Sequence, residues 1–391
     1  MHYILISLAD IILVISSFII VFTYLGFPLF IYFLSKISAQ AGYNPHKNLY
    51  NIPSLQVIVA CYNEAERIEE RLEDIFAQNY PSDRLSVLVI SDGSTDHTAT
   101  VVRKMQQRHA AVHLFELPDN LGKNQAINAA FSAGAFQADL LCFTDADGLF
   151  EAGALASAAK FFADPLVGLV GGKISYWLGE GAIQQTEGFF WQLENFLRQK
   201  EGDLGVLISC TGQFIQLRRE LFCPLPDAVN TDFALPLMVL AQGYQSRFDQ
   251  NAVVRSLFPA DQEKVLKRRR RTIIRALTTI AHYRNQLPVQ IRQVVFWHKT
   301  ARFLVFPLQL AMLLSNIFLV VLTDWLIWSG LLGLQVLFYG IALLGWLAQL
   351  FQIPLPLVHL PYQFTLQNAV AFGAVIAYLR GERVAKWTPP R

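Results

Sequence analysis

The chain has 391 residues, of which 53% are hydrophobic and only 16% charged, and its formal net charge is +2. Such an apolar composition is unlike that of an ordinary soluble globule and predicts segments that lie in a membrane. We expect no nucleic-acid partner.

The first apolar segment, Ile11–Leu34, contains no charged residue. At 1.5 Å per residue it is long enough to cross a bilayer. A cleaved signal peptide is the alternative, but no Lys or Arg precedes the run and it is too long. Lys36 and Lys47 follow it, which places the next part of the chain in the cytoplasm by the positive-inside rule. We therefore predict an N-terminal transmembrane helix within residues 1–35.

Residues 53–260 show short β-rich runs that alternate with helical stretches, the pattern of an α/β domain. The expected strands are Ser54–Cys61, Leu85–Asp92, Val112–Leu117 and Leu140–Thr144, separated by helices at Glu64–Gln78, Thr95–Arg108 and Lys123–Phe136. This order predicts a mostly parallel, Rossmann-like sheet with right-handed crossovers. Ligands of such sheets bind beyond the carboxyl ends of the strands.

Asp145 and Asp147 follow one of these strands and are separated by a single residue. In an extended chain, residues i and i+2 point to the same side, so both carboxylates can face one hard cation. Magnesium or manganese would keep coordination positions for a diphosphate. Alternatively, Asp147 and Gly148 form a turn and Asp145 caps the next helix. Neither a G-x-G-x-x-G fingerprint nor a P-loop is present.

The stretch Asp92–Asp96 begins like a calcium loop, but His97 and Arg103 occupy positions that need Gly and Glu. That excludes a calcium loop. Ser94 or Asp96 is expected to cap the next helix. Asp92 lies too early to cap and is expected to accept hydrogen bonds from a bound base or ribose.

Taken in order, these segments resemble the family 2 inverting glycosyltransferases, which have the GT-A fold and use nucleotide-diphospho-sugars. The matching stretches are VIVACYNEAERIEERLEDIFAQNYP, LSVLVISDGSTDHT, LGKNQAINAAF, CFTDADG, TGQFIQLRRELF and NTDFALPLMVLAQGY. Each stretch is short, but their order covers most of the chain. The most similar subgroup is membrane-bound, with an N-terminal helix and a C-terminal tail rich in Trp and Arg, here Trp387–Arg391.

The resemblance implies roles for the matching residues. Donor-binding residues would be Tyr62, Asn63, Glu64, Asp92, Lys123 and Asp145. Asp147, with Asp145, would hold the Mg²⁺ or Mn²⁺ ion that bridges the diphosphate. Asp232, preceded by Thr231, would be the catalytic base.

The chemistry supports this division of roles. Displacing a nucleotide diphosphate develops negative charge on the leaving group, which a cation and nearby Lys or Arg stabilise. The acceptor hydroxyl loses its proton on the opposite face of the sugar, so a single carboxylate there suffices for inversion. The alternative role for Asp232 is a favourable negative charge at a helix N-terminus.

The region between the metal site and the base is suited to holding an acceptor. Gly212 is expected to allow close approach. Candidate side chains are Trp177, Phe189, Phe190, Trp191 and Gln213. Aromatic faces stack on sugar rings, but aromatic residues near a membrane also serve as anchors, and both readings stay open.

Seven basic residues lie within the fourteen of KVLKRRRRTIIRAL, Lys264–Leu277. Residues 261–299 are therefore predicted to include a basic amphipathic helix that lies on anionic lipid. The resemblance adds an arginine that contacts the diphosphate, from a Gln-x-x-Arg-Trp motif, with Arg268, Arg270 and Arg271 as candidates. Thr272 replaces the Trp that belongs mainly to processive synthases, so we expect transfer of one or a few sugars.

Residues 300–391 contain two stretches long enough to span a membrane, Phe303–Leu322 and Trp325–Phe351, and a shorter one, Phe364–Leu379. The positive-inside rule favours two crossings, with the third stretch re-entrant or on the surface, because basic residues follow it. We expect a multi-pass protein of the cell membrane with a cytoplasmic catalytic domain.

Together these observations predict a metal-dependent integral-membrane hexosyltransferase. It would move a sugar from a nucleotide-diphospho-sugar, with UDP as the expected nucleotide, to a lipid or saccharide acceptor. A processive polysaccharide synthase is the alternative. A nucleotidyltransferase would need a glycine-rich phosphate loop, and a non-enzymatic transporter would show hydrophobic repeats; the sequence has neither.

Overall fold

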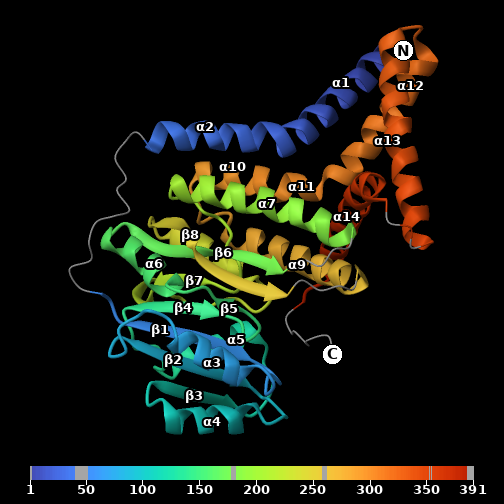
Figure 1. The fold of residues 1–391 in the computed structure, drawn as a ribbon. Helices are drawn as coiled ribbons and strands as arrows, with labels where there is room; N and C mark the ends of the chain where they lie inside the picture. The colour runs from blue at the N-terminus through green and yellow to red at the C-terminus, as the bar shows by residue number, and fades with distance from the viewer. Residues whose placement is uncertain are drawn as a thin grey trace.

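The computed structural model describes residues 2–39, 52–177, 182–257, 262–351, 353 and 355–384. An α/β domain forms one side of the molecule, further helices lie across it, and long apolar helices extend from one end (Figure 1). The predicted tail Trp387–Arg391 lies outside the described residues.

The α/β domain is built on a mixed sheet of order β3-β2-β1-β4-β7-β6-β8-β5. Its strands are β1 (Leu55–Cys61), β2 (Leu85–Asp92), β3 (Val112–Leu117), β4 (Leu140–Thr144), β5 (Leu149–Phe150), β6 (Val167–Trp177), β7 (Ile215–Arg218) and β8 (Gln245–Leu257). Strands β1 to β4 are mutually parallel, and Val57 pairs with both Val87 and Cys142. Strand β7 runs antiparallel to β4 and β6. The four predicted strands and the mostly parallel α/β sheet are confirmed.

Three predicted crossover helices are also present, as α3 (Ile68–Phe76), α4 (Thr98–Arg108) and α5 (Lys123–Ser132). Helix α3 begins later than predicted because the N–H groups of Glu64 and Ala65 donate to the side chains of Thr98, at the start of α4, and of Asp96, just before it. Helix α5 ends early, shortly before Gly134, which has a φ of +74°. Asp96 caps α4, as expected, by accepting a hydrogen bond from the Thr98 N–H (2.9 Å).

The sequences of strands β1 and β2 are nearly continuous apolar runs, because other parts of the domain cover both faces of the sheet. Ile58 packs into the core on one face, whereas Val57 and Val59 pack into the core on the other. The remaining helical segments of the domain are α6 (Ala154–Ala159), η2 (Lys160–Ala163), η3 (Arg219–Leu221) and α8 (Thr231–Ala241). Helix α8 is apolar on nearly all sides and is buried almost throughout.

The other helices connect this domain to the apolar end of the molecule. They are α1 (His2–Val21), η1 (Phe22–Gly26), α2 (Phe27–Ala39), α7 (Ala182–Asp203), α9 (Gln262–Tyr283), α10 (Val289–Val295), η4 (Phe296–Thr300), α11 (Ala301–Phe303), α12 (Val305–Leu322), α13 (Leu326–Leu350) and α14 (Pro356–Leu379).

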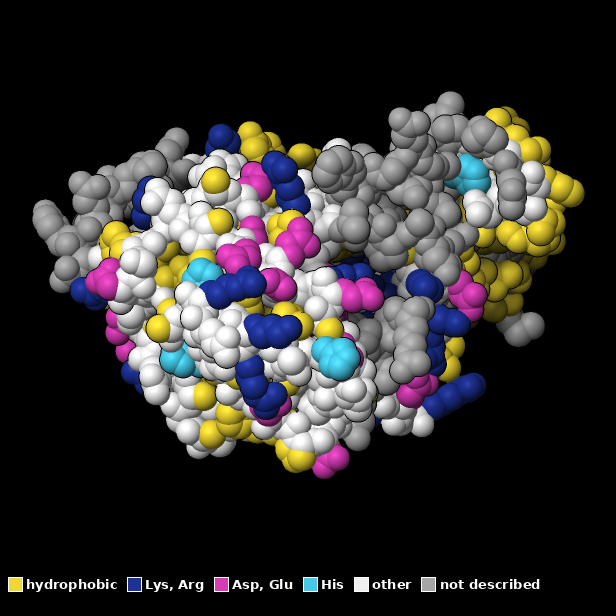
Figure 2. Space-filling view, turned by 60° about the horizontal axis from the view of Figure 1, so that its bottom comes forward, with side chains coloured by type: hydrophobic (Ala, Val, Ile, Leu, Met, Phe, Trp, Pro, Cys, Tyr) yellow, Lys and Arg dark blue, Asp and Glu magenta, His cyan; other side chains and the backbone are white. Residues whose placement is uncertain are grey.

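Three segments of the described chain are long and apolar enough to cross a membrane: Tyr3–Ser38, Val305–Leu322 and Leu326–Leu350. The first contains the π-helical turn η1, after which the helix changes direction; α1 packs along α12 and α2 along α7 (Figure 1). Figure 2 shows hydrophobic side chains gathered at one end of the molecule, while the α/β domain carries mixed charges.

The basic helix α9 differs from its expected setting. It packs against α8 and α14, and protein rather than lipid covers Ile273, Ile274 and Ala276. Lys264 and Lys267, near its N-terminus, are exposed. The apolar stripe of α9 is therefore part of the protein core, and attraction of its exposed basic residues to lipid remains a prediction.

A buried arginine of α3 supports the end of β4. Arg71 is fully buried; its Nη1 donates to Asp74 Oδ2 (2.5 Å) and its Nη2 to Thr144 Oγ1 (2.7 Å). Its guanidinium lies 3.8 Å from the ring centroid of Phe150. Burial lowers the pKa of Arg71, and the Asp74 carboxylate opposes that shift. These contacts hold β4 and β5 at the point where the Asp145–Asp147 segment leaves the sheet.

Replacement of Arg71 by Met should therefore destabilise the protein by about 3 kcal/mol, because Asp74 and Thr144 lose a buried charged partner. The matched control is Arg84→Met, since Arg84 forms an exposed 3.6 Å ion pair with Asp83 worth about 0–1 kcal/mol. The measurement is the melting temperature of each purified variant in the same detergent. Equal melting temperatures for the two variants would contradict this role of Arg71.

Candidate active site

The loop after β1 is tied to the loop after β2. Asn63 has a positive φ of 57°, and its Oδ1 accepts a hydrogen bond from the Thr95 N–H (2.8 Å). The Asn63 N–H donates to Ser94 Oγ (3.2 Å). Left-handed backbone is costly for a residue with a side chain and occurs often at binding sites. Tyr62, Asn63 and Glu64 are thus held at the carboxyl end of the sheet, where donor binding is predicted.

Asp92, at the end of β2, is buried, and both of its oxygens are engaged. Oδ1 accepts from the Leu121 N–H (2.7 Å) and Oδ2 from the Gly122 N–H (2.8 Å). The sequence predicts that the Asp92 carboxylate is available to bind a base or ribose. In the structure this carboxylate accepts hydrogen bonds from the loop before α5 and fixes its conformation. Asp92 therefore positions Lys123, and a contact with the base would use its remaining lone pairs.

Lys123, the first residue of α5, reaches the end of β4. Its Nζ bonds to Asp145 Oδ1, and both side chains stay partly accessible to solvent. Because Lys123 follows β3 and Asp145 follows β4, the sheet edge brings together two residues that the sequence separates. An ammonium group there can stabilise negative charge on a bound phosphate.

Asp147 is accessible to solvent but lies among other charged groups. Its Oδ1 accepts a hydrogen bond from Gln213 Nε2 (2.7 Å). Although Asp147 still contacts solvent, the surrounding protein displaces part of its water and raises its pKa; the Asp145 carboxylate raises the pKa further, and Arg268 opposes both effects. Burial likewise raises the pKa of Glu64, with added contributions from Asp147 and Asp145. Three carboxylates therefore share one region of negative potential.

Gln213 occupies the space left by the missing side chain of Gly148. A Cβ built on Gly148 would lie 1.8 Å from Gln213 Oε1 and 2.8 Å from Val254 Cγ1. The backbone of Gln213 is fixed by Thr144, whose Oγ1 donates to its carbonyl (2.7 Å). Gln213 thus packs beneath Asp147 and orients its carboxylate, and a direct contact with the acceptor remains a prediction.

Gly212 lies between the two carboxylate sites. A Cβ built on it would be 3.6 Å from Asp145 Oδ2 and 4.0 Å from Asp232 Cβ. Asp232 is in the first turn of α8, and its carbonyl accepts a hydrogen bond from the Cys210 N–H (2.9 Å). Asp145 and Asp232 come from distant parts of the chain and converge on this glycine.

The segment before α8 is anchored by Asn124. Its Nδ2 donates to the carbonyls of Pro226 (2.9 Å) and Val229 (3.0 Å), and its Oδ1 accepts from Thr231 Oγ1 (2.7 Å). Asn124 directly follows Lys123 on α5. The sequence reasoning missed this residue, although its place beside Lys123 in LGKNQAINAAF was a signal.

Helix α9 binds the same segment from its other side. Arg275 donates to the Val229 carbonyl from Nε (3.1 Å) and Nη2 (2.5 Å). Asn230 donates through its side chain to the Thr272 carbonyl (2.9 Å), and its N–H donates to Thr279 Oγ1 (3.1 Å). Burial lowers the pKa of Arg275, and the nearby Asp232 carboxylate opposes the shift. Arg275 was not among the predicted site residues.

The three arginine candidates on α9 separate into two groups. Arg268 is hydrogen-bonded to Tyr176 and close enough to Asp147 to lower its pKa. Burial lowers the pKa of Arg271 to about 10, and the positive charges of Arg275 and Arg268 add to that effect. Arg268, Arg271 and Arg275 therefore form one cationic face of α9, on which Arg268 lies near Asp147 and Arg275 lies near Asp232.

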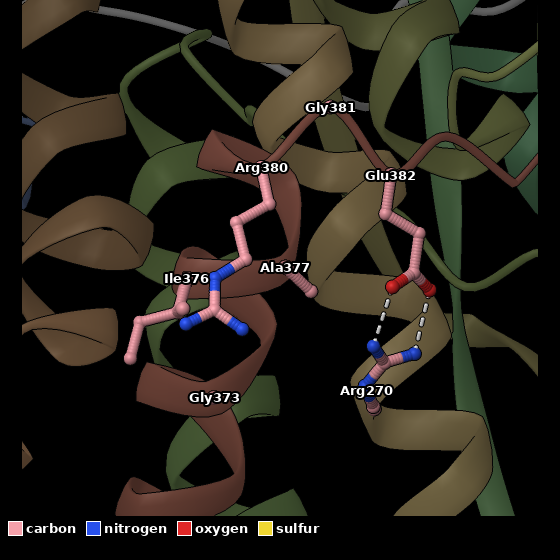
Figure 3. A pocket seen from close by; sticks show the side chains of 7 residues that line it. All are labelled: Arg270, Gly373, Ile376, Ala377, Arg380, Gly381 and Glu382. Atoms are coloured by element: carbon pink, nitrogen blue, oxygen red, sulfur yellow. Dashed lines mark hydrogen bonds and ion pairs between the residues drawn. The ribbon is translucent and has the colours of Figure 1, made fainter.

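Arg270 lies on a different face of the helix. Its Nη1 and Nη2 bond to the two carboxylate oxygens of Glu382, at 2.7 and 2.6 Å (Figure 3). The pair borders a cavity of about 540 Å³ that also contacts the end of α14, including Arg380 and Gly381. None of the carboxylates of the candidate active site lines this cavity. The structure thus gives Arg270 a structural partner, and a contact of Arg268 or Arg271 with a diphosphate remains a prediction.

Trp191 of α7 is connected to the site by its contact with Tyr176 of β6. Their ring centroids lie 5.0 Å apart, and the Arg198 guanidinium lies 5.7 Å from the Trp191 ring. Trp191 is therefore packed between an aromatic ring and a cation, and its predicted contact with an acceptor is untested. The side chains of Trp177, Phe189 and Phe190 lie outside the described residues.

Comparison with known proteins shows which family the chain belongs to. The family model "Glycosyl transferase family 2" matches residues 56–223, and "Glycosyl transferase family group 2" matches residues 141–355, more than half of the chain. Poly-beta-1,6-N-acetyl-D-glucosamine synthase of Staphylococcus aureus (strain COL) is 24% identical over 241 residues, 59% of this chain and 56% of that protein. The N-acetylglucosaminyltransferase of Rhizobium meliloti (strain 1021) is 28% identical over 240 residues, 56% of this chain and 55% of that protein. The matches thus span about half the length of these curated relatives.

A solved structure confirms the fold. The mannosyltransferase PcManGT from Pyrobaculum calidifontis, in complex with GDP-Man and Mn²⁺, superposes with a TM-score of 0.69 at 22% identity. The match covers 95% of this chain and all of that one. The predicted GT-A fold is therefore correct, and the chain belongs to glycosyl transferase family group 2, which makes it a family 2 glycosyltransferase.

Proposed function

We propose that this protein is an inverting, membrane-embedded glycosyltransferase that uses a UDP-sugar, a divalent cation and Asp232 as general base. The observation that carries the proposal is the convergence of Asp145 and Asp232 on Gly212. It supplies two separate acidic positions, as inversion requires: one near the leaving group and one across the sugar for the acceptor.

The carboxylates at the end of β4 fit a divalent cation. Loss of water raises the pKa of Asp147 and repulsion by Asp145 raises it further, and a cation would relieve that repulsion. Among the described residues, no group of three or more Asp, Glu, His and Cys is arranged to hold a metal alone. This suits Mg²⁺ or Mn²⁺, which bind few carboxylates and take phosphate oxygens as further ligands. When bound by Asp147 and Asp145, the ion would neutralise charge on the leaving diphosphate.

The chain's own cations would assist at the leaving group. Lys123 lies beside Asp145, and Arg268 and Arg271 project from α9 toward the same region. Arginine matches phosphate oxygens with paired N–H groups, and positive charge placed before the reaction stabilises charge that develops in the transition state. Donor binding by Tyr62, Asn63, Glu64 and Asp92 completes the nucleotide side of the site.

Asp232 would act on the acceptor. Asp232 lies in the first turn of α8, where the helix dipole favours negative charge, and near the Arg275 guanidinium; its carboxylate would accept a proton from an acceptor hydroxyl. The acceptor is proposed to be a lipid or a saccharide that approaches past Gly212 and Trp191. Membrane segments beside the catalytic domain support a lipid-linked acceptor and a cell-membrane location, and the positive-inside rule supports a cytoplasmic active site.

A processive polysaccharide synthase is the second candidate. The name of the 24%-identical Staphylococcus aureus relative favours it. Thr272, in the position of the processive enzymes' Trp, favours transfer of one or a few sugars instead; its carbonyl is occupied by Asn230. The length distribution of the products, measured by mass spectrometry, separates the two candidates.

Substitution Asp232→Asn should lower kcat for transfer by about 10²-fold or more, because the acceptor hydroxyl loses its base, while the Kd for the UDP-sugar stays within threefold. Asp147→Ala should instead weaken binding of Mn²⁺ and of the donor. The control is Asp227→Asn, an exposed residue of the preceding loop. Steady-state kinetics and donor-binding titrations on purified protein provide the test. Wild-type turnover by both Asp232→Asn and Asp147→Ala would refute the assigned roles.

The two arginines of α9 provide a further test. Arg271→Ala should lower kcat/KM for the donor by about tenfold or more, because a cation near the diphosphate is lost. Arg270→Ala, its matched neighbour, should change kcat/KM by less than threefold, since its partner is Glu382. Inhibition by UDP should weaken only for Arg271→Ala. The reverse order of effects would show that α9 is oriented differently in the working enzyme.

A further inference from the structure

Six charged or titratable side chains form a buried cluster between the catalytic domain and the apolar helices. The junction cluster consists of Glu194, Arg198 and Glu201 of α7, His298 and Lys299 of η4, and Arg302 of α11. The side chains of Glu194, Glu201, Arg198 and His298 are at most 5% exposed, and those of Arg302 and Lys299 are 11% and 19% exposed. None of these residues has a role in the proposed transfer reaction.

Glu194 is the centre of the cluster. It accepts from Lys299 Nζ (2.6 Å) and Arg302 Nη1 (3.1 Å), and Arg198 Nη2 lies 3.5 Å away. Burial would raise the pKa of Glu194, but Lys299 and His298 hold it well below its usual value. His298 lies between two carboxylates, with Nδ1 2.5 Å from Glu201 and Nε2 3.2 Å from Glu194.

The cluster carries more positive than negative charge. A carboxylate only accepts hydrogen bonds, so either His298 is protonated or one glutamate holds that proton. In both cases His298, Glu194 and Glu201 together contribute one negative charge. Lys299, Arg198 and Arg302 contribute three positive charges, which leaves a net charge of about +2 in a buried place. Burying charge without a partner is costly, so an anion is expected there.

Unused hydrogen-bond donors identify where the anion would bind. Among the described residues, Nε and Nη1 of Arg198 and Nε and Nη2 of Arg302 are buried without a hydrogen-bond partner. Arg198 is 5% exposed. Two guanidinium groups with free N–H donors match the oxygens of a phosphate better than those of any neutral ligand.

The cluster lies where the chain enters the apolar end of the molecule. Arg302 is three residues before α12, which is long and apolar enough to span a membrane. Its guanidinium lies 6.0 Å from the ring of Tyr24 in η1. The two π-helical turns meet here, because Phe22 of η1 packs against Trp297 of η4 at 4.5 Å. Such turns are rare and often mark functional sites.

The same cluster also approaches the catalytic side of the protein. Arg198 stacks near Trp191, and Trp191 packs against Tyr176. The Cys210 N–H donates to the Asp232 carbonyl. Cys210 also lies within electrostatic range of Arg198, Lys299 and Asp232. An anion in the cluster would therefore lie between the apolar helices and the general base.

We propose that the junction cluster binds a phosphate group, through the free donors of Arg198 and Arg302, and that a lipid at the membrane boundary supplies it. Basic pockets at the ends of membrane helices bind lipid phosphates by the same chemistry. Phosphate binding goes beyond the proposed transfer reaction and does not depend on it, because the lipid can be a substrate or a permanent neighbour. Entry occurs on the side of Lys299 and Arg302, the more exposed members of the cluster.

Binding is measured on the full chain in dodecyl maltoside, without any nucleotide sugar, as the rise in melting temperature with added ligand. The probes are dioctanoyl phosphatidic acid, dioctanoylglycerol and inorganic phosphate. Phosphatidic acid should stabilise the protein and dioctanoylglycerol should not. Stabilisation by inorganic phosphate at the same concentrations would also support the phosphate site but assign a soluble source. No response to either phosphate would overturn the proposal.

Variants locate the site. Arg198→Met and Arg302→Met should each weaken the apparent affinity for phosphatidic acid at least tenfold, whereas Arg292→Met, an exposed arginine of α10, should change it less than twofold. Without ligand, Arg198→Met should melt no lower than the wild type, because a surplus charge is gone. A lower melting temperature with an unchanged response to phosphatidic acid would show a purely structural role and overturn the proposal.

A charge-raising variant keeps the test valid where the arginine variants do not fold. Glu201→Gln retains the shape of the side chain and raises the net charge of the cluster by one. It should tighten phosphatidic acid binding at least threefold. Unchanged or weaker binding by a folded Glu201→Gln protein would contradict the charge argument. Because no donor sugar is present, these outcomes are independent of whether Asp232 is the catalytic base.

Discussion

The hydrogen bonds of residues 229–231 determine how the two halves of the active site face each other. Asn124 of α5 binds this segment on one side, and Arg275 of α9 binds the Val229 carbonyl on the other. Asn124 directly follows Lys123, and Asp232 directly follows Thr231. The proposed diphosphate side, the proposed base and the basic helix are therefore coupled through a few buried bonds, whose polar groups would be costly to leave unpaired.

This coupling explains why α9 carries so many charges. Arg275 is structural and fixes the segment before Asp232. Arg270 holds the end of α14 through Glu382. Arg268 lies near Asp147, which follows β4, and Arg271 lies close to Arg268 on the same face. The basic stretch thus combines packing, attachment to the C-terminal helix and positive potential at the site, whereas a membrane-surface helix would need only exposed lysines and arginines.

The strands of the catalytic domain could be predicted because each is a short apolar run that ends in polar residues, and β2, β3 and β4 have the expected bounds. The start of α3 could not be predicted in this way. It depends on hydrogen bonds between the side chains of Asn63 and Asp96 and backbone groups about 30 residues away in the sequence. Nor could the sequence separate Arg270 from Arg271. Adjacent residues point about 100° apart on a helix, and the packing of α14 decides which one faces the site.

The junction cluster could not be predicted from the sequence either. Glu194 and His298 are about 100 residues apart, and each is unremarkable within its own helix. Only the packing of α7 against η4 and α11 brings them together. For Asp92, in contrast, the sequence predicted the position at the end of a strand. It did not predict the hydrogen bonds from Leu121 and Gly122, through which Asp92 also stabilises the following loop.

A structure of the protein with a bound UDP-sugar and Mn²⁺ tests the central claim most directly. The proposal predicts a metal ion on Asp147, a diphosphate beside Lys123 and Arg271, and an anomeric carbon whose open face points at the Asp232 carboxylate. A donor bound with its anomeric carbon turned away from Asp232, or a metal held elsewhere, would contradict it.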